Sequence, residues 1–144
     1  MSNILITGAS GYIGSRLSYS LAKEGNKITA VCHSGIPLDK EWCSLMNQVI
    51  VRDITSKDVI EELTNNYYDT AIHLVSLDHN ASNKTPEFVN SINVMPVWNL
   101  LEAFKIKKTL KRFVYFSTIH VYGKLPNNVI DESFVPKPKT PYAL

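Results

Sequence analysis

The stretch TGASGYIG, from Thr7 to Gly14, holds three of the six glycines in this chain of 144 residues. It follows a β-rich run that ends at Thr7 and opens a helical pattern. In that context Gly8 permits a tight turn, Gly11 lets the backbone approach a pyrophosphate, and Gly14 lets the helix pack closely on a sheet. Tyr12 and Ile13 lie at the helix N-terminus, where free N–H groups favour phosphates. The stretch predicts dinucleotide binding; the alternative is a glycine-rich turn with no ligand.

Strands and helices are predicted to alternate along the rest of the chain. The apolar runs that predict strands are Ile4–Thr7, Lys27–Cys32, Gln48–Val51, Thr70–Val75 and Arg112–Ser117. The segments with helical spacing are Tyr12–Glu24, Lys57–Asn65 and Thr85–Ile106. Such alternation favours βαβ units, and right-handed crossovers then give an α/β fold. We expect a Rossmann-like doubly wound parallel sheet with helices on both faces.

Three segments depart from this regular alternation. Pro96 falls inside the longest helical pattern and is expected to kink or split that helix. Residues 33–46 have no clear period and are expected to be irregular. After Ser117 a proline-rich stretch predicts a long loop, which ordered proteins usually keep for function. The loop leads into Tyr142, where the pattern suggests the first turn of a helix.

Composition excludes several classes of protein. The net charge of +2 indicates no particular partner, and the basic run Lys105–Arg112 falls where a helix end would favour cations, so no nucleic acid is expected. Cys32 and Cys43 have neither metal-ligand nor disulfide spacing. No signal peptide and no membrane-spanning run is present. We therefore expect a cytoplasmic protein with no metal and no membrane partner.

The end of the second predicted strand bears on the choice of cofactor. An acid there binds the ribose hydroxyl of NAD, but this chain reads AVCHS, with no acid. His33 could help to hold the 2′-phosphate of NADP, or it is an ordinary loop histidine, and the two readings weigh evenly. The cofactor is expected to be NAD or NADP, with NADP slightly favoured.

The spacing of the three glycines resembles that of the short-chain dehydrogenase/reductase superfamily, and the resemblance extends along the chain. VRDIT looks like the segment whose acid contacts adenine, which implies Asp53 and Ile54; a turn or cap role for Asp53 is the alternative. AIHLVS resembles the strand beside the cofactor, which implies that Leu74, Val75 and Ser76 line the site.

NVMPVWNLLEA resembles a helix of the same superfamily. Asn93 and Asn99 match its asparagines, and Pro96 takes a glycine position. The resemblance implies cofactor contact for Asn93, although a buried structural role is at least as well supported. In the family this helix forms part of a dimer contact, so a homodimer is expected of the full-length parent.

FSTIHVYG followed by DESFVPKPKTPY carries the most specific resemblance, to the extended branch, the NAD-dependent epimerase/dehydratases that act on nucleotide-sugars. There a hydroxyl five residues before the glycine and a tyrosine opening a Tyr-x-x-x-Lys motif are catalytic. They match Thr118 and Tyr142. The tyrosine removes an O–H proton during hydride transfer, which requires its pKa to fall well below about 10, and the motif's lysine supplies that shift. The hydroxyl fixes the reacting oxygen.

The resemblance also implies that the chain is the N-terminal portion of an enzyme. It stops two residues short of the motif's lysine, and family members are roughly twice as long. Residues 1–144 would be an incomplete NAD(P)-binding domain, inactive alone, without later strands and the substrate lobe. The parent would be a nucleotide-sugar epimerase, dehydratase or reductase. The alternatives are a non-catalytic NADP-binding sensor, which generally lacks the Thr/Tyr pair, and a functionless fragment.

Overall fold

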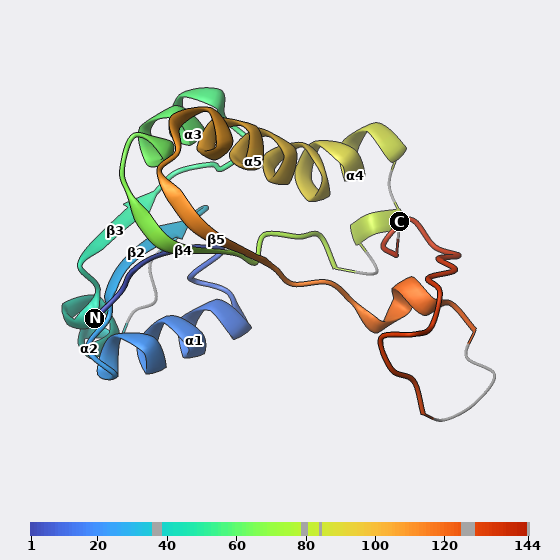
Figure 1. The fold of residues 1–144 in the computed structure, drawn as a ribbon, viewed down its shortest axis with the longest axis horizontal. Helices are drawn as coiled ribbons and strands as arrows, with labels where there is room; N and C mark the ends of the chain where they lie inside the picture. The colour runs from blue at the N-terminus through green and yellow to red at the C-terminus, as the bar shows by residue number, and fades with distance from the viewer. Residues whose placement is uncertain (36–38, 79–80, 84, 125–128, 144) are drawn as a thin grey trace.

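The computed structural model describes residues 1–35, 39–78, 81–83, 85–124 and 129–143 (Figure 1). Its five parallel strands form one sheet in the order β3-β2-β1-β4-β5. The strands are β1 (Asn3–Thr7), β2 (Lys27–Cys32), β3 (Gln48–Val51), β4 (Tyr68–His73) and β5 (Leu110–Tyr115). The helices are α1 (Tyr12–Lys23), α2 (Lys40–Leu45), α3 (Lys57–Thr64), α4 (Pro86–Asn93) and α5 (Met95–Lys107). Two short 3₁₀ turns are η1 (Ala81–Asn83) and η2 (Ile119–Tyr122).

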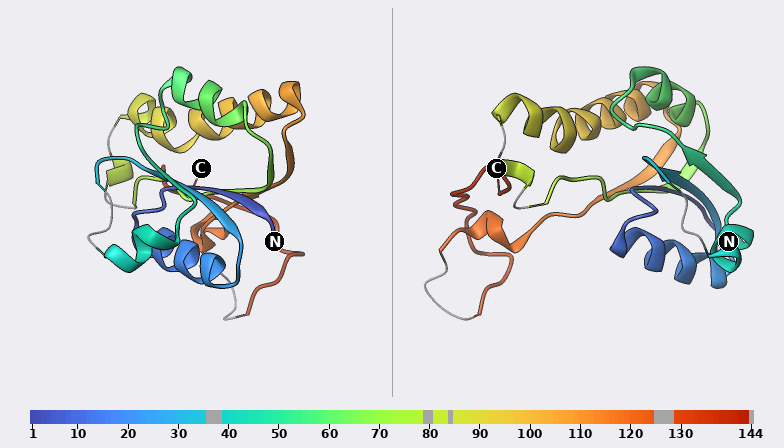
Figure 2. Two further views of the ribbon diagram at one scale, coloured as in Figure 1. Left: turned by 90° about the vertical axis from the view of Figure 1, so that its left-hand side faces the viewer. Right: turned by 180° about the vertical axis from the view of Figure 1, so that it is seen from behind.

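Helices cover both faces of the sheet, as predicted (Figure 2). Because neighbouring side chains on a strand point to opposite faces, Leu5 packs in one core while Ile4 and Ile6 pack in the other. The core with Leu5 is closed by α3 and α5, and the core with Ile6 by α1 and α2. The central strand β1 is therefore apolar almost throughout, as a strand buried on both faces should be.

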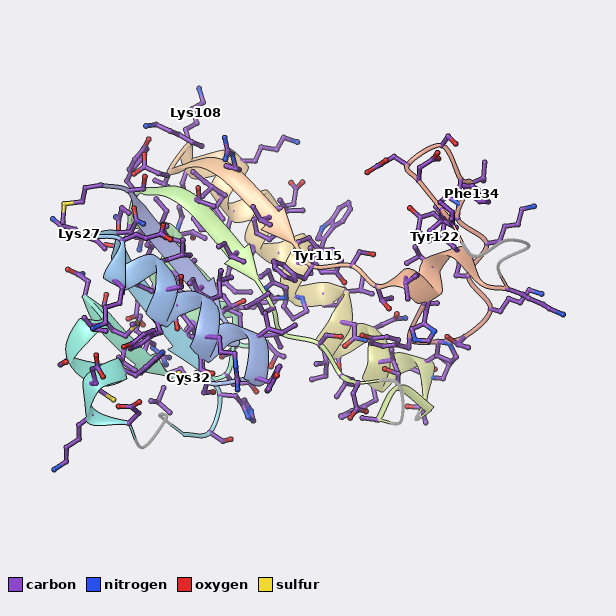
Figure 3. The ribbon with its side chains drawn as sticks, turned by 90° about the horizontal axis from the view of Figure 1, so that it is seen from below. Lys27, Cys32, Lys108, Tyr115, Tyr122 and Phe134 are labelled. Atoms are coloured by element: carbon purple, nitrogen blue, oxygen red, sulfur yellow. The ribbon has the colours of Figure 1, made fainter. Side chains whose placement is uncertain are left out.

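The strand order reverses at β1, which pairs with β2 on one side and β4 on the other. In open parallel sheets a ligand binds beyond the carboxyl ends of the strands at such a reversal. Figure 3 labels Lys27 and Cys32 at the two ends of β2, and Tyr115 at the carboxyl end of β5. The topology thus places a site at the end of the sheet that carries Cys32 and Tyr115.

Two strands begin and end two residues earlier than predicted. β4 is Tyr68–His73 instead of Thr70–Val75, and β5 is Leu110–Tyr115 instead of Arg112–Ser117. Their pairing begins between Tyr68 and Leu110, before either apolar run. Asp69 stabilises this start, since its carboxylate accepts the Asn3 N–H at 2.9 Å and lies 2.8 Å from the Lys111 ammonium.

The expectation that residues 33–46 are irregular was wrong for their second half, which contains α2. Asp39 caps this helix, and its side chain accepts the backbone N–H groups of Glu41 and Trp42. Trp42 is buried, and its indole N–H donates to the Ser18 hydroxyl at 2.8 Å. At six residues the helix is too short to display a helical period in the sequence.

The long helical pattern divides just before Pro96, as its position predicted. α4 ends at Asn93, and Pro96 occupies the first turn of α5, where its missing N–H costs no hydrogen bond. α5 ends with Lys108 in the left-handed conformation, with φ 54°, and with Lys105 and Lys107 in the last turn. These cations complement the helix dipole, as expected for the basic run.

The segment after Tyr115 leaves the sheet and runs out beyond its carboxyl end, carrying Tyr122 and Phe134 (Figure 3). Apart from η2, its described residues form neither helix nor strand. It folds back on itself, since the Lys137 N–H donates to the Val121 carbonyl at 2.8 Å. A helix was suggested at Tyr142; the described residues there form one turn, in which the Ala143 N–H donates to the Thr140 carbonyl at 2.9 Å.

Among the described helices, none combines the length and apolar character needed to cross a membrane.

Candidate dinucleotide site

The glycine turn brings α1 directly against the end of β1. Gly8 has φ +72°, a conformation that side chains rarely adopt, and its carbonyl accepts the Gly11 N–H at 3.1 Å. A Cβ on Gly14 would lie 2.2 Å from that carbonyl oxygen, so the helix can approach this closely only with glycine there. Gly8 and Gly14 are therefore required by the backbone itself.

The N-terminus of α1 is available to an anion. Its N-cap is Gly11, which has no side chain that could cap the first-turn N–H groups, and no acid lies in the first turn. Tyr12 is 75% exposed and Ile13 52% exposed, so the first turn of the helix faces open space. Its free N–H groups and the helix dipole both favour negative charge, and the geometry fits a pyrophosphate.

Two cavities meet at this turn, and Gly8 and Leu77 line both. The larger has a volume of about 750 Å³ and the smaller about 340 Å³. Every residue predicted to bind cofactor or substrate lines one of them. The larger is lined by Gly8, Gly11, Tyr12, Ile13, Gly14, Leu74, Ser76, Asn93, Thr118 and Tyr142, among others. The smaller is lined by His33, Asp53, Ile54 and Val75, again with Gly8.

The smaller cavity has mostly apolar walls and one polar corner. Val31, Ile92 and Phe88 are among the apolar residues, which suit a flat aromatic base. At the corner a carboxylate oxygen of Asp53 lies 3.8 Å from Nε2 of His33. Asp53 also accepts the Thr55 N–H at 2.9 Å, and that bond lowers the pKa of the Asp53 carboxyl. Asp53 thus has the turn role that was considered for it, and it also lines the smaller cavity.

Arg52 shares that corner and was missed in the sequence. Its backbone N–H donates to the Cys32 carbonyl at 2.8 Å, because β3 lies beside β2. Its guanidinium forms ion pairs with Asp58 and Glu62. A basic residue directly before the predicted adenine-contacting acid was the available signal, but only the strand pairing shows that Arg52 lies next to the end of β2.

The larger cavity carries the two predicted catalytic residues. The Thr118 hydroxyl accepts the His120 N–H at 3.3 Å and so caps η2. The rings of His120 and Tyr142 meet edge to face with their centroids 5.8 Å apart. Thr118, Tyr142 and the glycine turn therefore line a single cleft, although they come from distant parts of the chain.

Other polar residues shape the floor of this cleft. The Asn93 side chain accepts the Leu77 N–H at 2.8 Å and ties α4 to the segment after β4. This is the structural role that was weighed for Asn93, although the residue is half-buried and also lines the cleft. Asp78, another cleft residue that sequence reasoning missed, accepts the Ala81 N–H at 2.7 Å.

His73 lies beneath the glycine turn, at the end of β4. It is 2% exposed, and its Nδ1 is 2.8 Å from the Thr7 hydroxyl. Its ring lies nearly parallel to those of Phe113 and Tyr115, with centroids 6.4 and 6.3 Å away. Burial lowers the pKa of His73 to about 4, so the imidazole is neutral near neutral pH. Nε2 has no hydrogen-bond partner among the described residues.

No group of three or more His, Cys, Asp or Glu side chains is placed to hold a metal within the described ranges.

The fold and the two cavities define an α/β dinucleotide-binding domain of the Rossmann type. The sequence matches the NAD dependent epimerase/dehydratase family over residues 4–144, and the chain belongs to that family. It is 31% identical, over 97% of its length, to a dTDP-glucose 4,6-dehydratase from Streptomyces niveus, of which it covers 45%.

Solved structures agree with this assignment. MoeE5 in complex with UDP-glucose and NAD matches with a TM-score of 0.82 and 29% identity, over 98% of this chain and 44% of that one. A mutant UDP-glucuronic acid 4-epimerase from Bacillus cereus, in complex with a fluorinated UDP-sugar and NAD, matches with a TM-score of 0.76 and 27% identity, over 98% and 48%. The chain spans less than half the length of these relatives.

Proposed function

We propose that the protein is a nucleotide-sugar epimerase, dehydratase or reductase in which Tyr142 is the acid/base and a bound nicotinamide dinucleotide exchanges hydride with a sugar carbon. The observation that carries the proposal is the shared cleft. Thr118, Tyr142 and the glycine turn line one cavity of about 750 Å³, with a smaller apolar cavity beside it. This arrangement suits a dinucleotide whose base enters the small cavity and whose reactive end faces the two hydroxyl groups.

The residues divide the work of such a reaction. Gly8, Gly11 and the first turn of α1 would hold the pyrophosphate. When bound, the cofactor supplies a hydride acceptor and donor. Tyr142 would take the proton of the sugar hydroxyl, and Thr118 would hold that oxygen in place by a hydrogen bond.

The test compares Tyr142→Phe and Thr118→Val in the complete protein. General acid–base catalysis contributes about 10²- to 10⁴-fold, so Tyr142→Phe is expected to lower kcat by about 10²-fold or more while dinucleotide affinity stays unchanged. Tyr122→Phe is the matched control, because Tyr122 lies in the same segment but does not line the cleft. Full turnover by Tyr142→Phe would contradict the proposal, and a protein that binds NADP without turnover would be the non-catalytic sensor.

We further propose that residues 1–144 are the cofactor-binding half and that the sugar is chosen by additional chain. Support comes from the relatives, which are more than twice as long.

No disulfide joins Cys32 and Cys43 in the described part of the chain, which favours a cytoplasmic location.

A further inference from the structure

Arg52 lines the smaller cavity, and its guanidinium pairs with two carboxylates of α3, those of Asp58 and Glu62. We propose that Asp58 and Glu62, by neutralising Arg52, make this site select NAD over NADP; the proposal rests on the dinucleotide site proposed above. This opposes the slight preference for NADP that the missing acid after β2 suggested.

The position of Arg52 is the first step. Residues that end β2 face the adenosine ribose in this fold, and the last of them here is Cys32, a buried thiol. Arg52 directly follows β3, whose last residue, Val51, pairs with Cys32, and the Arg52 N–H donates to the Cys32 carbonyl, so the Arg52 backbone lies beside the end of β2. Arg52 and His33 both line the smaller cavity. A 2′-phosphate at this corner would therefore meet whatever charge Arg52 presents.

The charge around Arg52 is the second step. Its two terminal nitrogens are each paired with a carboxylate of α3, one with Asp58 and the other with Glu62. Asp53 adds a third carboxylate at the same corner. One guanidinium thus stands against two paired carboxylates and a third that lines the same cavity, so these four side chains together carry net negative charge.

The net negative charge around Arg52 affects the binding of NAD and NADP differently. A phosphate at the 2′ position brings nearly two negative charges, while the diol of NAD brings none and its hydroxyls can donate to carboxylates. To bind the phosphate, Arg52 would have to leave two partners. These pairs are exposed and individually weak, so the discrimination comes mainly from the summed negative charge. Two carboxylates of α3 therefore replace the acid missing from β2.

The experiment measures NAD and NADP binding by calorimetry. The wild-type protein is expected to bind NAD about tenfold more tightly than NADP, an effect that a few charges at a protein surface can produce. The double variant Asp58→Asn/Glu62→Gln is expected to shrink this ratio about fivefold, mainly by tightening NADP, because the freed Arg52 can then meet the phosphate. Adding Arg52→Gln to the double variant is expected to remove that gain.

The matched control is Glu24→Gln/Glu102→Gln, which removes the same amount of charge but leaves both carboxylates that pair with Arg52 in place. It should leave the ratio unchanged, and thermal melts should show that all variants fold. The proposal is overturned if wild-type protein binds NADP as tightly as NAD, or if the double variant keeps the wild-type ratio. Binding of neither dinucleotide would overturn the proposed function as well, so the two failures are distinguishable.

Discussion

The three glycines of the turn, Gly8, Gly11 and Gly14, are needed for different physical reasons. Gly8 needs its left-handed φ, and Gly14 needs the absence of a Cβ that would otherwise meet the Gly8 carbonyl. Gly11 is less constrained, because its φ is −70° and a Cβ there would lie 3.3 Å from the same oxygen, a tight approach but much less severe than that at Gly14. We therefore expect that glycine is needed at position 11 mainly to make room for the ligand, and less to allow the backbone conformation.

Two substitutions separate these demands. Gly14→Ala is expected to lower the free energy of unfolding by about 1–3 kcal/mol through overpacking. Gly11→Val should cost less than about 1 kcal/mol as a poorer N-cap, yet weaken dinucleotide binding by about tenfold or more. Denaturant unfolding and calorimetric titration measure the two effects. Unchanged dinucleotide affinity in Gly11→Val would remove the pyrophosphate from this turn.

His73 should make stability depend on pH. Burial disfavours the charged imidazole, so the pKa of His73 is about 4 in the folded protein, against 6.5 for an unperturbed histidine. The unfolded chain therefore binds a proton that the folded chain refuses, and stability is lost as pH falls from about 6.5 towards 4. At pH 5 the loss is expected to be about 2 kcal/mol relative to pH 7.5.

The measurement is urea unfolding of wild type and His73→Gln at both pH values. The variant will be less stable overall because its packing changes, but it should lack this part of the pH dependence. An equal slope with pH in both proteins would show that His73 does not cause it.

Individual site residues could be predicted from the sequence only where they belong to a local motif. The glycines, Thr118 and Tyr142 stand in recognisable motifs, so their gathering around one cleft was expected. Arg52 and Asp78 stand in no such motif. They reach the two cavities because of the way the chain folds around them, which the local sequence does not indicate. The pairing of Arg52 with α3 depends on side-chain contacts that no spacing rule describes.

At the scale of elements, an exposed apolar stripe runs along the start of α5. Val94, Met95, Trp98 and Leu101 recur at helical spacing, and Trp98 is 62% exposed. Such a stripe on a monomer is a candidate for burial against a partner. It lies on the helix for which a dimer contact was expected from the family resemblance.

We expect the complete protein to sediment as a dimer at micromolar concentration, and Trp98→Glu to sediment as a monomer. Placing a charge in a buried apolar interface is strongly unfavourable. Val135→Glu is the control, because Val135 is at least as exposed as Trp98 but lies in the C-terminal segment. A wild-type monomer under these conditions would argue against the contact.

Element types were predictable where apolar periodicity was strong, as in β1 and α1. The starts of β4 and β5 were not, because Asp69 and Lys111 lie within the strands and pair with each other across them. Local hydrophobicity favours a later start, while the hydrogen-bonded ladder extends to Tyr68. α2 was missed for the opposite reason, since a capping Asp39 and one buried Trp42 stabilise a helix too short to show a period.

At the scale of the whole molecule, cofactor binding and catalysis should be separable. Residues 1–144 alone are expected to bind NAD, which would stabilise them by about 2.7 kcal/mol at one hundred times the Kd. No turnover is expected, because the relatives use a chain more than twice as long. Thermal melts with NAD and nicotinamide absorbance with a panel of nucleotide-sugars would check both. Turnover comparable to that of the complete protein would contradict this division.

The strand order also has a consequence for biosynthesis. β1 leaves the ribosome first and lies at the centre of the sheet, β2 then pairs with one side of it, and β3 extends that side. β4 pairs with the opposite side of β1, and β5 extends it. Every later strand thus emerges to find its partner already made, so no strand has to be inserted between two others. The nascent chain can enlarge its sheet outward in the order of translation, and the second edge of β1 stays open until β4 arrives.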